Sequence, residues 1–118
     1  MGQGILKTNS KIDFKDQFTI ANGATESGAI FTHGDVVSAL RFPAAFNGDS
    51  VSFKCAEALD GTYIALLDNS GALYTVPVTV SSHQTLDLLL MNTVNYVKIV
   101  CSEAQDAERT ITAVSQPV

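Results

Sequence analysis

The feature of this sequence that most constrains its fold is a two-residue alternation of apolar and polar side chains. In SVSFKCA, residues 50–56, Val51 and Phe53 alternate with polar neighbours. Successive side chains of a β-strand point to opposite faces of a sheet, so this pattern predicts a strand that is buried on one face. The same alternation recurs in NYVKIVC, residues 95–101, and in RTITAVS, residues 109–115. We therefore expect three half-buried strands at these positions.

Six weaker strand candidates are rich in β-branched or aromatic residues. They are QFTIAN (17–22), GAIFT (28–32), VVSALRF (36–42), TYIALLD (62–68), LYTVPVTV (73–80) and TLDLLL (85–90). Gly, Asn and Asp residues that favour turns separate them. Strands that follow one another roughly every ten residues predict an antiparallel sandwich or barrel. Pro77 lies inside one candidate and predicts that this segment is an edge strand or a bulge.

One segment carries a weak helical signal. Leu86, Leu89 and Leu90 have helix-like spacing within residues 82–91. The segment is short for a stable helix, and we expect strand or irregular backbone there.

The length of 118 residues corresponds to one domain. The first residues are polar with regularly spaced lysines, which is typical of a loosely held terminal segment. We therefore predict an extended N-terminal arm at residues 1–16 and a single β-sandwich domain at residues 17–118.

The chain is poor in charge for its size. Hydrophobic residues make up 46% of the sequence and charged residues 16%, against roughly 25% charged in typical globular domains. Two interpretations remain open: partner subunits cover part of the surface, or neutral polar side chains cover it.

The net charge of −5 disfavours nucleic-acid binding, because the basic residues form no patch that could attract phosphates. The apolar runs are too short to cross a membrane, and the N-terminus lacks the apolar stretch of a signal peptide. The sequence thus predicts neither a nucleic-acid nor a membrane partner, and synthesis in the cytoplasm.

The sequence also lacks the patterns on which common enzyme chemistry depends. It contains no G-x-S-x-G nucleophile turn and no glycine-rich phosphate loop. His33 and His83 both fall in polar, turn-like stretches, which favours solvated loop histidines over catalytic or metal-binding ones. We expect no enzyme activity, no cofactor and no metal site.

Two alternatives concern the cysteines and the turn aspartates. Cys55 and Cys101 lie inside predicted strands, where buried free thiols are favoured over a disulfide between facing strands. Asp49, Asp60 and Asp68 are most simply turn formers, although they could converge on a Ca²⁺ ion.

Three stretches of the chain together resemble a set of short tailed-phage structural proteins. They are SGAI (27–30), the segment from LRFPAAF through SVSFK and ALDGTY to Tyr74 (40–74), and NYVKIVC through RTIT to SQPV (95–118). The D-G-T-Y hairpin and the Y-V-K-I strand also resemble discoidin-like jelly-roll modules, which bind sugars or lipids. The absence of Trp departs from that second pattern.

The resemblance implies an all-β antiparallel sandwich of jelly-roll type that decorates or cements a phage capsid, or occupies another head or tail position. Its partners would be the major coat protein or other virion proteins, and it would form a homo-oligomer, such as a trimer. The arm's apolar anchors would be Ile5, Leu6, Phe14 and Phe18, which contact a partner or pack back onto the chain's own sandwich. The alternative function is a ligand-binding jelly-roll module for carbohydrate.

Overall fold

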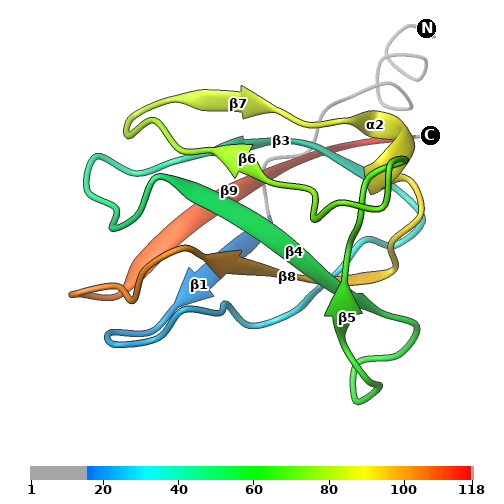
Figure 1. The fold of residues 1–118 in the computed structure, drawn as a ribbon, viewed down its shortest axis with the longest axis horizontal. Helices are drawn as coiled ribbons and strands as arrows, with labels where there is room; N and C mark the ends of the chain where they lie inside the picture. The colour runs from blue at the N-terminus through cyan, green and yellow to red at the C-terminus, as the bar shows by residue number, and fades with distance from the viewer. Residues whose placement is uncertain (1–15, 118) are drawn as a thin grey trace, which may run out of the picture.

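The computed structural model describes residues 16–117, which fold into short strands and one helical turn (Figure 1). The elements in chain order are β1 (Gln17–Ile20), β2 (Ile30–Phe31), β3 (Val36–Arg41), β4 (Ser50–Ala56), β5 (Ile64–Ala65), β6 (Val76–Pro77), β7 (His83–Thr85), α2 (Leu88–Met91), β8 (Tyr96–Cys101) and β9 (Arg109–Gln116). The predicted arm at residues 1–16 lies, except for Asp16, outside the described residues.

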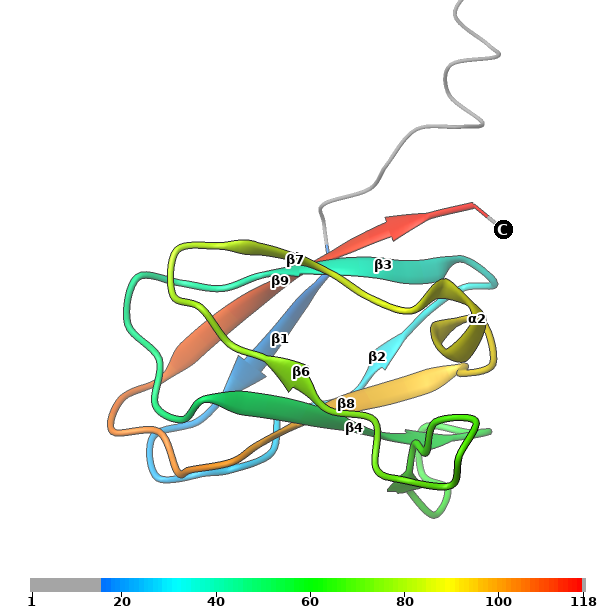
Figure 2. The same cartoon turned by 45° about the horizontal axis from the view of Figure 1, so that its top comes forward.

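The strands form two antiparallel sheets, which Figure 2 shows as two layers. One sheet has the order β1-β9-β3-β7, and the other has the order β2-β8-β4-β5, with β6 also paired to β4. The pairing is nested, because β1 pairs with β9, β2 with β8, β3 with β7, and β4 with β5 and β6. The prediction of an all-β antiparallel sandwich is confirmed.

The alternating pattern produces the core between the two sheets. In β4, Val51 and Phe53 are buried while their neighbours are partly exposed. Phe53 lies directly opposite Ile99 of β8, and both side chains have no exposed surface. Burial of a large apolar side chain stabilises the fold by about 1.5–3 kcal/mol. The three alternating segments thus lie where the sequence predicts strands.

Phe18 belongs to this core. Its side chain is fully buried in β1, where it pairs with Ile111 of β9. The assignment of Phe18 as a partner contact is therefore wrong, and of the two alternatives it packs onto the chain's own sandwich. The alternation of QFTI explains the burial, since Phe18 and Ile20 share the inward face. Ile5, Leu6 and Phe14 lie outside the described residues.

The region between β4 and β8 differs from the expected series of strands. The candidates at residues 62–68 and 73–80 shorten to the two-residue strands β5 and β6. Pro77 lies in β6, which pairs with β4 alone, so the prediction of an edge strand is confirmed. The expectation of strand or irregular backbone over residues 82–91 holds for β7 and is wrong at Leu88–Met91, where α2 forms.

The two cysteines lie on adjacent strands but at different positions along them. Cys55 of β4 is opposite Val97, and Cys101 of β8 is opposite Val51. Four residues of strand separate the two positions, about 13 Å, whereas a disulfide requires Cα atoms within about 7 Å. Both cysteines are free thiols, so the disulfide alternative is ruled out by geometry.

Candidate protein-binding surfaces

The exposed large hydrophobic side chains are concentrated in one part of the described chain. Seven of the eight lie between residues 59 and 89, and they are Leu59, Ile64, Leu67, Leu73, Val80, Leu88 and Leu89. Single exposed apolar residues are ordinary, but a concentration on neighbouring segments is typical of a surface that binds another protein.

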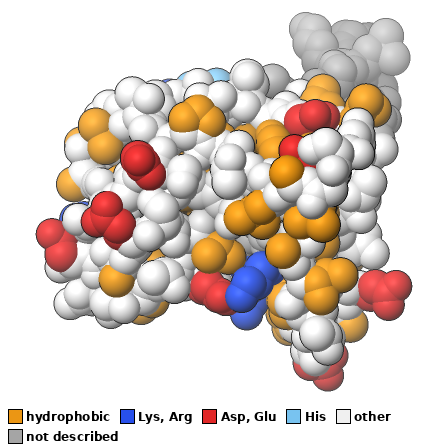
Figure 3. Space-filling model, viewed as in Figure 1, with side chains coloured by type: hydrophobic (Ala, Val, Ile, Leu, Met, Phe, Trp, Pro, Cys, Tyr) orange, Lys and Arg blue, Asp and Glu red, His pale blue; other side chains and the backbone are white. Residues whose placement is uncertain are grey.

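The first of two candidate surfaces, which we name the hairpin surface, comprises Leu59, Ile64, Leu67 and Leu73 on the connection from β4 to β6. Each of these side chains is at least 46% exposed. Figure 3 shows hydrophobic side chains gathered over β5 and the neighbouring part of β4. β5, which carries Ile64, pairs with β4 over only two positions, and its other edge is open.

The segment that carries the hairpin surface is held by local hydrogen bonds. The Tyr63 hydroxyl donates to the Leu59 carbonyl oxygen at 2.9 Å. The Asp68 carboxylate accepts from the Ser70 amide at 2.9 Å and the Ala72 amide at 3.0 Å. Hydrogen bonds from Ser70 and Ala72 lower the pKa of Asp68 below its ordinary value. The apolar side chains are thus presented on an ordered backbone.

Asp68 therefore forms a turn, as the simpler of the two sequence interpretations predicts. Within residues 16–117, no three His, Cys, Asp or Glu side chains come together in a group that could hold a metal ion. The structure does not bring Asp49, Asp60 and Asp68 together as calcium ligands.

A surface hollow of about 530 Å³ lies beside the hairpin surface. Its walls are the end of β4 at Cys55 and Ala56, the hairpin at Gly61 and Ile64, and the connection from α2 to β8 at residues 93–95. Burial raises the pKa of the Cys55 thiol, which disfavours the nucleophilic thiolate. Covalent chemistry at Cys55 is therefore disfavoured in this hollow.

The second candidate surface, the α2 knob, consists of Leu88 and Leu89. Leu89 is 79% exposed and Leu88 is 44% exposed. The next two residues, Leu90 and Met91, are buried and fix the helical turn to the core. The knob is therefore exposed but carried on a backbone that Leu90 and Met91 anchor to the core.

Asp87 explains why this leucine-rich segment forms a turn of helix. Its carboxylate accepts hydrogen bonds from the Leu89 amide at 3.0 Å and the Leu90 amide at 3.3 Å. A cap of this kind satisfies amide groups that have no partner within the helix. The Asp87 amide donates to the Tyr74 hydroxyl oxygen at 2.8 Å, which ties α2 to the connection between β5 and β6.

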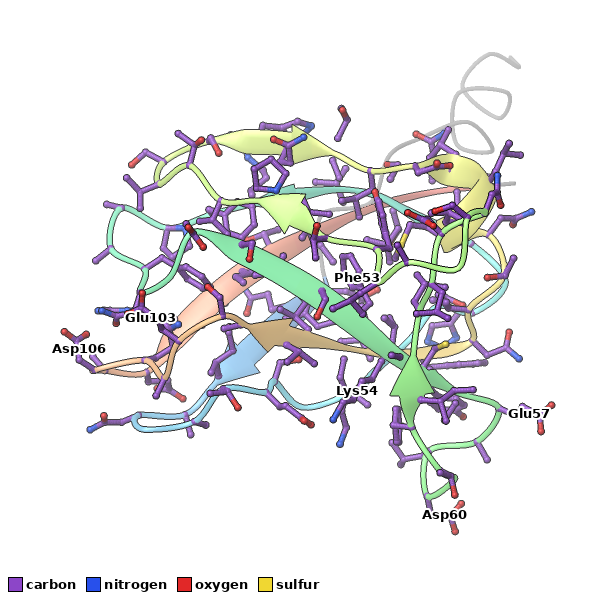
Figure 4. The ribbon with its side chains drawn as sticks, viewed as in Figure 1. Phe53, Lys54, Glu57, Asp60, Glu103 and Asp106 are labelled. Atoms are coloured by element: carbon purple, nitrogen blue, oxygen red, sulfur yellow. The ribbon has the colours of Figure 1, made fainter. Side chains whose placement is uncertain are left out.

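Charged residues on the outer face of β4 and β8 serve the fold. Lys54 lies directly opposite Lys98, an arrangement that destabilises a sheet by repulsion. Glu26 pairs with the Lys54 ammonium at 2.6 Å, and the Lys98 ammonium lies 4.4 Å from the centre of the Tyr63 ring. Figure 4 labels Lys54 beside the hairpin that carries Tyr63. These contacts offset the repulsion and hold the hairpin against β8.

The two histidines lie in a turn and in a short strand. His33 has a positive φ of 56° in a turn and packs against Phe31, with ring centroids 4.4 Å apart. His83 is exposed in β7. Over residues 16–117, no helix is long and apolar enough to cross a membrane.

The sequence predicts partner contacts in the arm and does not predict the two surfaces. The available signal was the presence of apolar runs without alternation, IALL at residues 64–67 and LLLM at residues 88–91. Such a run in a short segment cannot place every side chain in the core of a thin sandwich.

Comparison of the chain with models of known protein families, with curated proteins and with solved structures found no match in any of the three.

Proposed function

We propose that this chain is a non-enzymatic structural protein of a tailed-phage particle, which decorates the capsid by binding coat subunits through the α2 knob. The observation that carries the proposal is the pair Leu88 and Leu89, held outward on a capped and anchored turn. The partner in this proposal is the major coat protein, and the place of action is the virion.

The energetics of the knob favour binding over any role in the fold. Leu89 contributes little to stability while it is 79% exposed. Its transfer into a pocket of a partner removes apolar surface from water, worth about 1.5–3 kcal/mol for a leucine. The backbone is already ordered by Asp87, so binding does not have to order it.

The strand order supports the proposed jelly-roll type. Nested pairing of first with last and second with second-last is what results when one long hairpin folds over on itself into two sheets. Jelly rolls of two packed sheets are common among viral capsid domains. The strand order therefore adds to the sequence resemblance to tailed-phage structural proteins as support for the proposal.

Such a protein stabilises the assembled shell through the free energy of its own binding. A protein that binds the assembled shell and not its free subunits shifts the equilibrium toward the shell, and the effect grows with its concentration. The low charge of the chain suits this task, because a surface poor in charge loses little hydration when it is covered.

The experiment is co-sedimentation of the full chain with assembled phage shells, together with the melting temperature of the shells. We expect saturable binding and a raised melting temperature with the unmodified chain. Leu89→Ser weakens the binding, whereas the matched control Val80→Ser, at another exposed apolar residue, leaves it unchanged. Equal binding by the Leu89 variant would remove the α2 knob from the proposal.

A second candidate function is a carbohydrate-binding module. One observation favours it: the exposed Phe31 ring stacks on Tyr96 with centroids 4.7 Å apart, beside His33. Exposed aromatic rings can pack against sugar rings through their apolar faces. Retention on a glycan array that is lost with Phe31→Ala would favour this candidate over capsid decoration.

A further inference from the structure

Two aromatic side chains and a lysine share the outer face of the sheet that contains β2, β8 and β4. Phe31 of β2 lies directly opposite Tyr96 of β8, and Ala56 of β4 lies opposite Tyr96 on its other side. Residues directly opposite one another in a sheet point to the same face. The burial alternation of β8 places Tyr96 and Lys98 outward and Val97 inward. Phe31, Tyr96 and Lys98 therefore point out from the sandwich on the same side.

Tyr63, next to β5, extends this group of side chains. Its ring lies 4.4 Å from the Lys98 ammonium, and the Phe31 ring stacks on Tyr96 with centroids 4.7 Å apart. Desolvation raises the pKa of the Tyr63 hydroxyl, and the nearby Tyr96 and Asp60 raise it further. Tyr63 and Tyr96 are thus close neighbours. We name Phe31, Tyr96 and Tyr63 the aromatic strip.

The aromatic strip is open to solvent. Phe31 is 41% exposed, and Tyr96 and Tyr63 are partly exposed. Ala56, beside Tyr96, is too small to cover the tyrosine ring. Among the described strands, β2 pairs with β8 alone, so the outer edge at Phe31 is uncovered. A ligand can therefore reach the rings without any movement of the sheet.

The charge of Lys98 has no carboxylate partner within residues 16–117. Lys54 lies directly opposite Lys98, and Glu26 pairs with the Lys54 ammonium at 2.6 Å. Lys98 instead contacts the ring of Tyr63, which carries no net charge. Like charges directly opposite one another destabilise a sheet. One carboxylate thus serves two facing lysines, and a second anion beside Lys98 would relieve the repulsion that remains.

The nearest acidic residues of the projecting hairpin do not fill this place. Figure 4 shows Glu57 and Asp60 on the far side of the hairpin, pointing away from Lys54. Neither forms an ion pair with a described lysine or arginine. Exposed charges that do not touch interact weakly across water and salt. The net charge of −5 is therefore compatible with a local anion site at Lys98.

We infer that the aromatic strip and Lys98 bind an oligosaccharide whose sugars carry a carboxylate. The apolar face of a sugar ring packs on Phe31 and Tyr96. The sugar carboxylate accepts a charge-assisted hydrogen bond from the Lys98 ammonium. His33, whose ring centroid lies 4.4 Å from that of Phe31, offers ring nitrogens to the sugar hydroxyls. The inference rests on the second candidate function, names its ligand class, and is independent of the α2 knob.

The arrangement predicts selectivity as well as binding. A neutral sugar covers the rings but leaves Lys98 to water, whereas inorganic phosphate reaches Lys98 but covers no ring. Only a ligand with both an apolar ring face and a carboxylate makes both contacts. Acidic sugars are therefore expected to bind more tightly than neutral sugars of the same size.

The test measures binding of the full chain to matched acidic and neutral oligosaccharides by isothermal titration calorimetry. One pair is an oligogalacturonate and its methyl ester, and the other is sialyllactose and lactose. In at least one pair, we expect the acidic member to bind about tenfold more tightly. Equal affinity within both pairs would overturn the inference and leave the second candidate function standing. Absence of binding to all four would also overturn it, and the glycan array then decides separately on the second candidate.

Variants assign the preference to Lys98. Lys98→Gln should bind both members of a pair with the affinity that the unmodified chain has for the neutral member. Thr85→Glu, exposed in β7 of the other sheet, makes the same change in net charge and should keep the preference. Phe31→Ala should weaken the binding of both members. A preference kept by Lys98→Gln, or lost equally in both charge variants, would overturn the inference and leave the shell-binding test of the α2 knob unaffected.

Discussion

Two regions of this sandwich differ in how many of their apolar side chains stay exposed. The paired region, residues 17–56 and 96–116, contains the longer strands and buries its apolar residues between the sheets. The projecting region, residues 57–95, contains two- and three-residue strands and a single helical turn. Seven of the eight exposed large hydrophobic side chains of the described chain lie there.

The difference follows from how many neighbouring strands each backbone segment pairs with. In the paired region, β8 and β9 each lie between two other strands, so one face of each is fixed toward the core. In the projecting region, β5 and β6 each pair only with β4. A segment with few backbone partners can leave its apolar side chains outside, where another protein can cover them.

The largest expected effect is in the paired region. Phe53→Ala removes a fully buried ring that stacks on Tyr74 and faces the opposite sheet. We expect a loss of about 3–5 kcal/mol in the free energy of unfolding, measured by urea denaturation. The matched control is Phe31→Ala, since Phe31 is 41% exposed. Similar losses for both would remove the contrast between core and surface rings.

The second effect concerns a buried polar contact between loops at the end of the sandwich. Gln105 is 1% exposed, and its side-chain amide exchanges two hydrogen bonds with the backbone of Asn47 at 2.8 and 2.9 Å. Gln105→Ala leaves those backbone groups unsatisfied, which costs about 1–3 kcal/mol. Gln84→Ala, at an exposed amide, is the control. A loss below that of the control would show that water replaces the contact.

The third effect is a pH dependence from Cys101. Burial raises the pKa of this thiol to about 11 from its ordinary value of 9.0. The unfolded chain therefore releases the proton first, and stability falls as the pH rises from 9 toward 11. Over this pH range, we expect the free energy of unfolding of Cys101→Ala to fall by about 2 kcal/mol less than that of the unmodified chain. Parallel curves for the two proteins would show that Cys101 does not titrate in this way.

The sequence predicts the paired region well and the projecting region poorly, for a physical reason. The strand expected at residues 50–56 coincides with β4, because an alternating pattern has one arrangement that buries its apolar face. The runs IALL and LLLM have no alternation, so no face is specified. The helical turn at α2 depends on the Asp87 cap and on the burial of Met91, which spacing alone does not reveal.

The candidate surfaces escape sequence reasoning for a related reason. An apolar residue such as Leu89 is read as core unless the tertiary structure shows it exposed. Ile5, Leu6 and Phe14, by contrast, are apolar residues among lysines, and their role as anchors stays a prediction. Phe18 differs from them, because it lies within the strand candidate at residues 17–22 and occupies the buried face of β1.

The smallest expected effect on stability is in the projecting region. Leu89→Ser changes the free energy of unfolding by no more than about 0.5 kcal/mol, as is usual for exposed positions. The same variant should lose binding to phage shells. Thermal unfolding followed by circular dichroism measures the first quantity. A large loss of stability would mean that Leu89 serves the fold, and the two regions would no longer differ in this respect.

The most direct test of the account is amide hydrogen exchange of the full chain, free and bound to assembled phage shells. The account predicts that binding slows exchange within residues 57–95, most strongly at α2, while the paired region is unchanged. Slower exchange confined to residues 17–56 or 96–116, or no change in any segment, would contradict the claim that the projecting region is the binding surface.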